Sequence, residues 1–333
     1  MKPTIKDIAG MTGVSVATVS RILNDQRGYS EETKERVEKA IKELGYKPNA
    51  VARNLVNRKS HTIGVLIPKL STSFSAKLLQ GIEAAAHQRQ YSVLICNTDS
   101  NGERTMDYIQ LLNEKQVDGV IFASELFTRE YCRELLSSGI PAVVVSSVSV
   151  HPEVPYIKIN DEEAAYAAAA YLIEKGHQNI GMISGTKHDP VAGMPRLRGF
   201  QRALKDYRLQ FENSQLVFGD FSYSSGYRAI EQLLEKNPYI TGVFAASDEM
   251  ALGVISYCYE KGIRIPDHLS VVGFDDTEIA QMSTPPLTTV HQPIEKMGSA
   301  AFAKLASLMN GEEAESSYLP FQIIERGSAK RLS

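Results

Sequence analysis

Polar and aromatic residues stand at the ends of several short apolar runs, where they could together bind a small polar molecule. Carboxylate and guanidinium groups each offer several hydrogen bonds of fixed direction, and aromatic faces add apolar contact. Such a set suits a polyhydroxyl or heterocyclic ligand. The residues of this kind are Phe74, Ser75, Ser146, Arg196, Asp220, Phe221, Ser247, Asp248, Asp275 and Asp276.

The elements that must position these residues alternate between short apolar runs and amphipathic helical stretches, a pattern typical of parallel sheets. The expected strands form two series, 62–68, 91–97, 118–124 and 141–147, then 179–185, 215–220, 242–247 and 269–276. The clearest helices between them are 75–90, 162–175, 224–235 and 248–261. Open α/β sheets bind ligands outside the carboxyl ends of their strands. We therefore expect the polar residues to meet in one cleft.

Some of these residues have a structural alternative. Asp248 precedes the helical run EMALG, so we interpret it as the N-cap of that helix rather than as a ligand contact. We interpret Asp276 as structural too, and Phe74 could equally belong to the pocket or to the core.

The first 46 residues contain three helical patterns. Thr4 is an N-cap for the first, and a turn containing Gly13 follows. Ser15 can cap a second helix that ends near residue 23, and Ser30 caps a third that stops at Gly45. Two short helices joined by a tight glycine-containing turn and supported by a third form a helix-turn-helix. The pattern alone also fits a plain three-helix bundle.

The outward residues of the second helix favour DNA reading. They are small, hydroxylated or cationic, so they can approach base edges and phosphates. Residues 1–60 carry 12 Lys and Arg against 7 Asp and Glu, whereas the whole chain has a net charge of −3. A basic end on an acidic remainder is typical of a nucleic-acid-binding module. The outward residues are Ser15, Val16, Ala17, Thr18, Ser20 and Arg21.

The run TIKDIAGMTGVSVATVSRILN and the later LGYKPNAVARNL resemble the head and hinge of the LacI/GalR family of bacterial transcription regulators. The resemblance continues to about Arg326. It implies a sequence-specific DNA-binding regulator, in our interpretation a repressor, that binds a palindromic operator as a homodimer. It also implies control by a small-molecule effector, which we expect to be a sugar or a sugar derivative.

The implied fold is an all-α helix-turn-helix head followed by an α/β core like that of periplasmic binding proteins, with two doubly wound parallel-sheet subdomains. We expect the DNA-binding domain at 1–46, a hinge helix and linker at 47–60, and the effector-binding and dimerisation core at 61–333. The N-subdomain would comprise about 61–160 and 292–322, and the C-subdomain about 161–291 and 323–333.

Matching positions carry the family's site residues onto this chain. The resemblance implies that the short helix at about 49–57 pairs with its twin in the minor groove, where Leu55 intercalates. The DNA-binding positions are Thr4, Ser15, Val16, Ala17, Thr18, Ser20, Arg21, Asn24, Asn49, Ala52, Arg53 and Leu55. The effector-binding positions are Phe74, Ser75, Ser146, Arg196, Phe221, Ser247, Asp275 and Gln292.

One segment departs from the family pattern. After the first strand the family usually has Asp-x-x-Asn-Pro-Phe-Phe, but this chain has KLSTSFS, with Ser73 in place of the proline and Ser75 in place of the second aromatic. We expect a roomier or more polar pocket, in which Lys69 could meet a phosphorylated or larger sugar. The chain has no tryptophan, so sugar stacking would fall to Phe221.

The remaining composition favours a cytoplasmic protein without cofactors. Cys96, Cys132 and Cys258 show no CxxC or metal-ligand spacing, and we see neither a signal peptide nor a transmembrane run. The expected partners are double-stranded operator DNA, an effector, a second copy of the chain and no membrane. A phosphocarrier protein remains a possible corepressor, as in catabolite control regulators.

Two other classes of function stay open as alternatives. An enzyme is disfavoured because we find no dinucleotide-binding GxGxxG, no P-loop, no nucleophile elbow and no metal-ligand cluster. A stand-alone sugar-binding protein would lack the basic head.

Overall fold

The computed structural model describes residues 3–23, 27–46, 59–99, 102 and 104–332. Contacts divide the chain into two compact units, Met1–Ser60 and His61–Ser333. Five of the predicted DNA-binding residues lie outside the described residues, so their role stays a prediction. These five are Asn24, Asn49, Ala52, Arg53 and Leu55.

The first unit contains a bundle of three helices, as the capping pattern predicts. Ser15 and Ser30 each accept a hydrogen bond from the N–H group three residues later, at 3.1 and 3.3 Å. Ile8, Val19 and Val37, one from each helix, are fully buried at the centre of the bundle. The helices are α1 (Ile5–Thr12), α2 (Val16–Leu23) and α3 (Glu31–Leu44).

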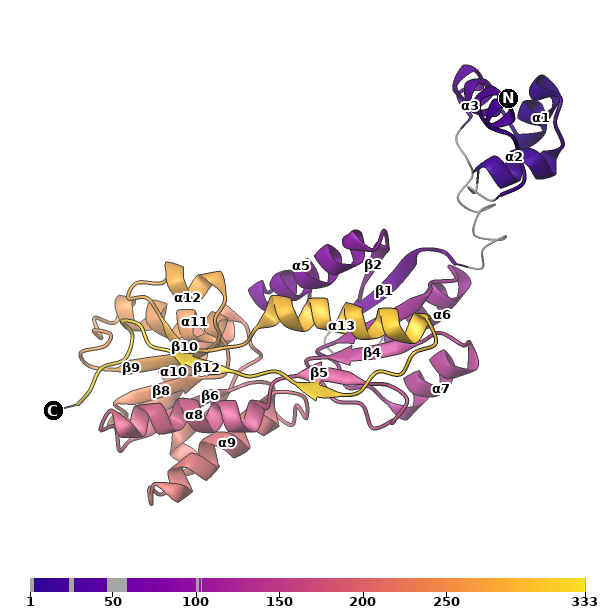
Figure 1. Ribbon diagram of the computed structural model, residues 1–333. Helices are drawn as coiled ribbons and strands as arrows, with labels where there is room; N and C mark the ends of the chain where they lie inside the picture. Colours follow the sequence, from indigo (N-terminus) through magenta and orange to yellow (C-terminus); the bar gives the residue numbers. More distant parts are fainter. Residues whose placement is uncertain (1–2, 24–26, 47–58, 100–101, 103, 333) are drawn as a thin grey trace. The chain divides into compact units, whose positions relative to one another are not determined.

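The second unit contains two lobes, and the first is a six-stranded parallel sheet of order β11-β5-β4-β3-β1-β2 with helices on both faces. Along β1, Ile63 and Val65 belong to the core under α5 and α13, whereas Leu66 belongs to the core under α6 and α7 (Figure 1). The strands are β1 (Thr62–Ile67), β2 (Ser92–Asn97), β3 (Gly119–Ala123), β4 (Ala142–Val145), β5 (Tyr156–Lys158) and β11 (Ser317–Tyr318). The helices are α5 (Ser73–Gln88), α6 (Thr105–Glu114), α7 (Arg129–Ser137) and α13 (Ile294–Met309).

The second lobe repeats this architecture with a sheet of order β12-β10-β9-β8-β6-β7. In Figure 1, α8 and α9 lie below this sheet, and α11 and α12 lie above it. The strands are β6 (Ile180–Ser184), β7 (Leu216–Phe218), β8 (Gly242–Ala245), β9 (Ser270–Asp275), β10 (Thr288–His291) and β12 (Gln322–Ile324). The helices are α8 (Asp161–Glu174), α9 (Gly193–Asp206), α10 (Tyr223–Lys236), α11 (Asp248–Glu260) and the short α12 (Glu278–Met282).

All eight predicted strands are present within a few residues of their expected bounds, but four others were not predicted. Each of the four, β5, β10, β11 and β12, has only two to four residues. The sequence of β10 is mostly polar, although Thr288 and Thr289 are fully buried. The prediction of parallel sheets is wrong at one position, because β12 pairs with β10 in antiparallel orientation. The chain passes between the lobes after β5, after β10 and between β11 and β12.

Helices of both lobes pack in pairs at glycine contacts that leave no room for a side chain. A Cβ atom at Gly81 of α5 would lie 2.1 Å from the carbonyl oxygen of Glu295 in α13, and one at Gly199 of α9 would lie equally close to the carbonyl oxygen of Glu162 in α8. The helix axes can therefore approach closely only while these positions remain glycine.

We expect Gly81→Ala to lower the free energy of unfolding of the second unit by about 1–3 kcal/mol, because the backbone of α13 must move to admit the methyl group. Urea denaturation measures this effect. Gly10→Ala is the matched control, since a Cβ atom at Gly10 meets no atom within 4 Å and alanine favours a helix. Equal stability of the Gly81→Ala variant and the wild type would contradict the packing argument.

In the described part of the chain, none of the helices combines the length and the apolar character needed to cross a membrane. Among the same residues, no group of three His, Cys, Asp or Glu side chains is placed to hold a metal ion.

Candidate functional site

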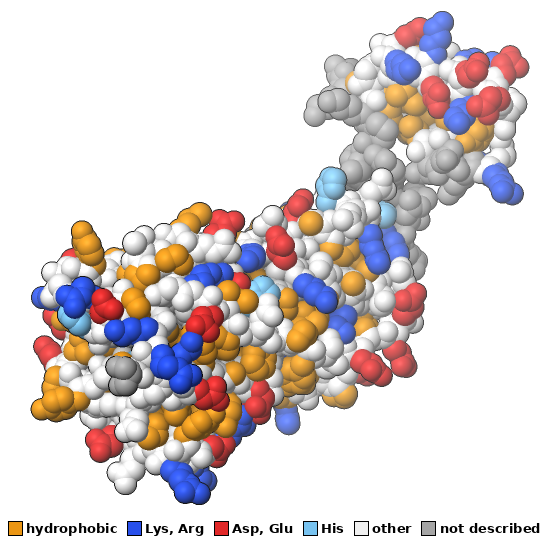
Figure 2. Space-filling view, turned by 60° about the vertical axis from the view of Figure 1, so that its left-hand side comes forward, with side chains coloured by type: hydrophobic (Ala, Val, Ile, Leu, Met, Phe, Trp, Pro, Cys, Tyr) orange, Lys and Arg blue, Asp and Glu red, His pale blue; other side chains and the backbone are white. Residues whose placement is uncertain are grey.

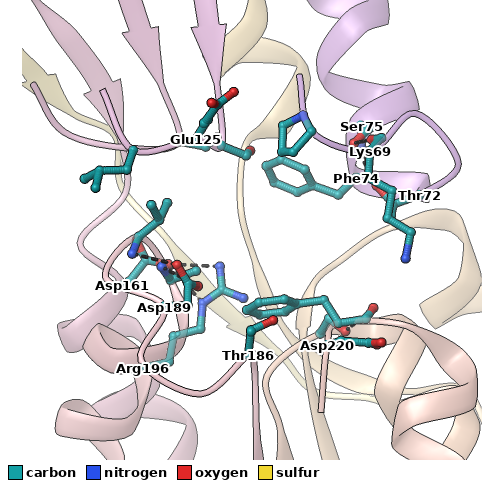
Figure 3. Close-up of a pocket in the computed structure, with 18 of the residues that line it drawn as sticks. Lys69, Thr72, Phe74, Ser75, Glu125, Asp161, Thr186, Asp189, Arg196 and Asp220 are labelled. Carbon is teal, nitrogen blue, oxygen red and sulfur yellow. Dashed lines mark hydrogen bonds and ion pairs between the residues drawn. The ribbon is translucent and has the colours of Figure 1, made fainter. Parts of the chain in front are cut away.

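A pocket of about 530 Å³ lies between the two lobes at the carboxyl ends of both sheets. Its volume falls within the range of small-molecule sites, about 300–1,000 Å³. Figure 3 shows Lys69 and Phe74 reaching into it from the first lobe, opposite Arg196 and Asp220 of the second. The structure brings together all eight predicted effector-binding residues, although their contact with an effector stays a prediction. All of Phe74, Ser75, Ser146, Arg196, Phe221, Ser247, Asp275 and Gln292 line the pocket.

Four pocket residues at strand ends have a left-handed backbone. The φ angles are 55° at Ser124, 57° at Ser146, 64° at Phe221 and 120° at Asp275. Such angles cost a non-glycine residue about 1–3 kcal/mol, and they cluster at ligand sites. The buried hydroxyls of Ser124 and Ser146 have no hydrogen-bond partner among the described residues. Because both residues line the pocket, its wall contains hydrogen-bonding capacity that the described residues leave unused.

Arg196 is held firmly on the second-lobe wall. Its Nε and Nη2 atoms both lie 2.9 Å from Oδ1 of Asp161, and Nη1 donates to the carbonyl oxygen of Ala246 at 2.6 Å. The guanidinium group stacks 3.6 Å from the ring centroid of Phe274. Since a guanidinium group has five N–H bonds, two remain for a ligand once these three contacts are made.

Two buried carboxyl groups, Asp275 and Asp248, also line the pocket on this side. Asp275 accepts a hydrogen bond from Nε2 of Gln292 at 2.7 Å and lies 4.0 Å from Nη1 of Arg196. Burial raises the pKa of Asp275 well above its ordinary value, although the charge of Arg196 opposes the shift. Burial also raises the pKa of Asp248 to about 7, while hydrogen bonds from Thr289 and Thr277 favour its ionised form. Both groups therefore resist ionisation.

The position of Asp248 corrects one prediction. The N-cap of α11 is Ser247, whose hydroxyl accepts the N–H of Met250 at 3.2 Å, so the interpretation of Asp248 as the cap was wrong. Asp248 instead accepts hydrogen bonds from the hydroxyl of Thr289 at 2.6 Å and from the N–H of Thr277 at 2.7 Å. It thereby connects the start of α11 to β10 and to the loop after β9.

The free energy of unfolding should depend on Asp248 in a specific pH range. Its folded pKa lies above the unfolded value, so the folded protein binds the extra proton and loses stability as pH rises from about 4 to about 7. Between pH 5 and pH 8 the loss should be on the order of 3 kcal/mol. Urea denaturation at the two pH values should show a smaller loss in Asp248→Asn. The slope that remains would come from Asp275, whose shift has the same sign.

Asp267→Asn is the control for this pH dependence. Asp267 is exposed, and its hydrogen bond from Lys330 lowers its pKa, so this variant should keep the wild-type loss between the two pH values. An Asp248→Asn variant with the same loss as the wild type would show that the carboxyl group ionises normally.

Asp276 has the structural role that its sequence position favours. Its two carboxylate oxygens pair with Nη2 of Arg326 at 2.6 Å and with Nδ1 of His291 at 2.8 Å. It does not line the pocket. The pair with Arg326 connects the end of β9 to the last part of the chain.

The first-lobe turn that departs from the family pattern is fixed by hydrogen bonds instead of by proline. The hydroxyl of Ser75 donates to the carbonyl oxygen of Lys69 at 2.6 Å and receives a hydrogen bond from the hydroxyl of Thr72 at 2.8 Å. At the start of α5, the N–H of Ser73 donates to Oε1 of Glu249 in the second lobe at 2.9 Å. The side chain of Ser75 thus stabilises the turn, and Glu249 ties the turn to the opposite lobe.

Lys69 leaves this turn and points toward Asp220 across the pocket (Figure 3). Burial opposes the ionisation of Asp220, but hydrogen bonds from Ser222 and Ser225 and the charge of Lys69 outweigh it, so the pKa is lowered. The far end of the pocket therefore carries an ionised carboxylate beside a lysine.

Several lining residues were not predicted, and two of them form part of a buried charge cluster. Lys158 and Asp161 line the pocket together with Glu125 and the loop 186–192. The lysine in the apolar run YIKI was the available signal, because a charged residue seldom occupies a buried strand without a partner. Glu125 gave no such signal, since its partners Thr98 and Thr105 lie 20 or more residues away in the sequence.

The first unit presents the predicted DNA-reading residues at the start of α2. Ser15, Val16, Ala17 and Arg21 are exposed, and Thr18 and Ser20 are partly buried. Thr4 is exposed at the start of α1, where its N–H and hydroxyl groups both lie 2.7 Å from Oδ2 of Asp7. This exposure is compatible with DNA contact, which stays a prediction.

The positive charge of the first unit does not come from α3. This helix carries five Glu against four Lys and Arg, and the face of the unit seen in Figure 2 shows side chains of both signs. Residues 47–60 carry four Lys and Arg and neither Asp nor Glu. Most of the excess is thus in residues 47–60, and residues 1–30 add a smaller share, with four Lys and Arg against two Asp.

Two protein-family models match this chain, one in each unit. Residues 4–49 match the model of the bacterial regulatory proteins of the lacI family, and residues 169–329 match the periplasmic binding protein-like domain. Catabolite control protein A of Priestia megaterium is 40% identical over 332 residues, which cover 99% of this chain and 100% of the relative. The chain belongs to the LacI family.

Solved structures of LacI-family members have the same fold. A lac repressor dimer bound to operator and the anti-inducer ONPF matches with a TM-score of 0.89 and 30% identity, covering 99% of this chain and 100% of the repressor chain. A complex of the transcriptional regulator CelR with cellobiose matches with a TM-score of 0.74 and 31% identity, covering 98% of this chain and 99% of the other. The predicted architecture, a helix-turn-helix head followed by a two-lobed α/β core, is therefore confirmed.

Proposed function

We propose that this LacI-family protein is a transcriptional repressor that binds a palindromic operator as a homodimer and responds to a small molecule in the pocket between its lobes. One observation carries the second half of the proposal. Residues far apart in the sequence meet around one pocket at the carboxyl ends of two sheets, and among them are two serine hydroxyls without a partner in the described residues and a guanidinium group with two N–H bonds left over. The lac repressor and CelR matches support an operator and a sugar-like effector.

The chemistry of the pocket favours a neutral or weakly charged polyhydroxyl compound. Its lining combines hydroxyl, amide and carboxyl groups with the rings of Phe74 and Phe221. Each polar group offers a directed hydrogen bond, and an aromatic ring contacts the apolar face of a sugar. Lys69 supplies a cation that suits a phosphorylated sugar, although the ionised carboxylate of Asp220 lies at the same end of the pocket and opposes a phosphate.

The two-lobed arrangement supplies the route of control. An effector held by both lobes sets the angle between them, which in a dimer sets the separation of the two segments that precede the lobes. Coupling of about 1–3 kcal/mol is typical of allosteric proteins. A bacterial transcription regulator must reach chromosomal DNA, and we therefore infer that the protein acts in the cytoplasm.

Selection of genomic fragments by the purified protein, paired with a thermal-shift screen of sugars, sugar phosphates and nucleobases, tests the proposal. We expect a palindromic fragment whose affinity falls steeply with salt, since phosphate contacts release counterions. We also expect one compound class that raises the melting temperature and changes that affinity. If no fragment is enriched with or without the compounds, the protein is not an operator-binding repressor.

A phosphorylated carrier protein as corepressor is the second candidate. The 40% identity with catabolite control protein A favours it. Adding a phosphorylated or an unphosphorylated carrier protein to the operator-binding assay distinguishes control by a protein corepressor from control by a small molecule alone. A catalytic role is the weakest candidate, and recovery of unchanged compound after prolonged incubation would argue against it.

A further inference from the structure

A buried ion pair lies where the chain first passes between the lobes. Lys158 ends β5 in the first lobe, and Asp161 begins α8 in the second. Both residues line the pocket, and each is only 6% exposed. The ammonium group of Lys158 lies 2.9 Å from Oδ2 of Asp161 and also donates to the carbonyl oxygen of Val191 at 3.4 Å.

The carboxylate of Asp161 therefore pairs with two cations from different lobes, Lys158 and Arg196. Oδ1 of Asp161 receives Nε and Nη2 of Arg196, and Oδ2 receives Lys158. The two contacts on Oδ1 fix one edge of the planar guanidinium group, and the bond from Nη1 to the carbonyl oxygen of Ala246 fixes another, so the two N–H bonds that remain have a set direction. A continuous chain of charges thus runs from α9 through the start of α8 to the edge of the first-lobe sheet.

The connection between α8 and α9 does not depend on this buried pair. Two exposed ion pairs already join the helices, Arg202 with Glu163 at 2.6 Å and Arg198 with Glu162 at 3.0 Å. The close approach at Gly199 adds backbone contact between them. Removing three charged groups from water costs free energy that their pairing only partly compensates. An ion pair that served only to join the helices would therefore be more stabilising at the surface.

We propose that Asp161 and Lys158 are positioning residues of the effector pocket. Asp161 holds the guanidinium group of Arg196 in the orientation that presents its two spare N–H bonds, and Lys158 holds Asp161 from the first lobe. The arginine that meets the effector is thereby connected to the opposite lobe through one carboxylate. A change in the angle between the lobes moves Lys158 relative to Asp161 and so changes how firmly Asp161 orients Arg196. Conversely, an effector bound to Arg196 favours one angle between the lobes. This inference rests on the proposed effector pocket.

Hydrogen exchange of the Arg196 Nε–H bond in the full chain tests the positioning directly, without any ligand. The ¹⁵N resonance is identified by its loss in Arg196→Lys. We expect slow exchange in the wild type, exchange at least about tenfold faster in Asp161→Asn, and a smaller acceleration in Lys158→Met that Lys158→Arg reverses. Glu163→Gln is the matched control, because it removes an exposed carboxylate–arginine pair between the same two helices. Its Arg196 exchange should equal that of the wild type.

A charge-balanced variant keeps the test decisive if Asp161→Asn fails to fold. The double variant Lys158→Met/Asp161→Asn removes one buried charge of each sign, so it leaves fewer unpaired ions than Asp161→Asn alone. We expect it to fold and to exchange the Arg196 proton as fast as Asp161→Asn. Slow exchange in the folded double variant would overturn the assignment of Asp161.

Calorimetry with cellobiose and D-ribose extends the test to binding. A compound that binds the wild type should bind the double variant about tenfold or more weakly, and Glu163→Gln with unchanged affinity. Unchanged affinity in the double variant, despite a mobile Arg196, would overturn the positioning role. If the wild type binds no compound of a wider sugar and nucleobase screen, the proposed pocket function fails, while the exchange measurement still decides whether Asp161 orients Arg196.

Discussion

Arg196→Ala should reduce effector affinity by roughly two to four orders of magnitude. The variant loses the two spare N–H bonds of the guanidinium group, and a hydrogen bond to a charged group contributes about 1.5–3 kcal/mol. Asp275→Ala should abolish the thermal shift as well, because it removes the carboxyl group 4.0 Å from Nη1. Operator affinity in the absence of effector should stay close to that of the wild type, since neither residue belongs to the first unit.

Arg202→Ala is the matched control for this prediction. Arg202 lies on the same helix, pairs with Glu162 and Glu163 and stacks on Tyr166, but it does not line the pocket. Circular dichroism and the melting temperature without ligand must be compared first, because Arg196→Ala leaves Asp161 with fewer partners. A normal ligand-induced shift in both Arg196→Ala and Asp275→Ala would reject the pocket assignment.

Leu55→Ala should weaken operator binding by about two to four orders of magnitude and reduce DNA bending. Leu55 lies outside the described residues, and the prediction rests on the hinge that the sequence resemblance implies. Burial of a leucine gains roughly 1.5–3 kcal/mol, and a dimer buries two. Unstacking a base step costs about a few kcal/mol. Binding is therefore nearly balanced, and loss of both leucines removes the gain that compensates for the deformed DNA.

Gel-shift phasing with the selected operator measures both quantities. Leu70→Ala is the control, because this leucine is 43% exposed in the second unit and its removal should change neither affinity nor bending. Wild-type bending in Leu55→Ala would mean that the leucine does not intercalate.

The three-helix head could be predicted because its signals are local. Ser15, Ser30 and Gly45 mark helix ends by hydrogen bonds and backbone angles within a few residues, and the structure has these caps. The long central strands were equally clear because both faces of each sheet are covered. β5, β10, β11 and β12 were missed since two to four residues carry too little periodicity, and their partners lie elsewhere in the chain.

The pocket shows the limit of sequence reasoning more sharply. The rule that ligands bind at the carboxyl ends of parallel strands, together with the family resemblance, led to all eight effector-binding predictions, and these residues share one pocket. Neither source could show that Asp248 is buried, because its partners Thr277 and Thr289 lie 29 and 41 residues later. The contact between Asp161 and Arg196 escaped for the same reason, because the two residues lie 35 positions apart.

The left-handed residues that end the strands set a limit on how this protein could be made more heat-resistant. Glycine at position 124 or 146 would relieve an unfavourable backbone angle, yet it would delete a hydroxyl of a residue that lines the pocket and would make the wall more flexible. At these positions, a substitution that raises thermal stability would therefore weaken ligand binding. A stabilised version for biotechnology would gain its robustness more safely at surface positions remote from the strand ends.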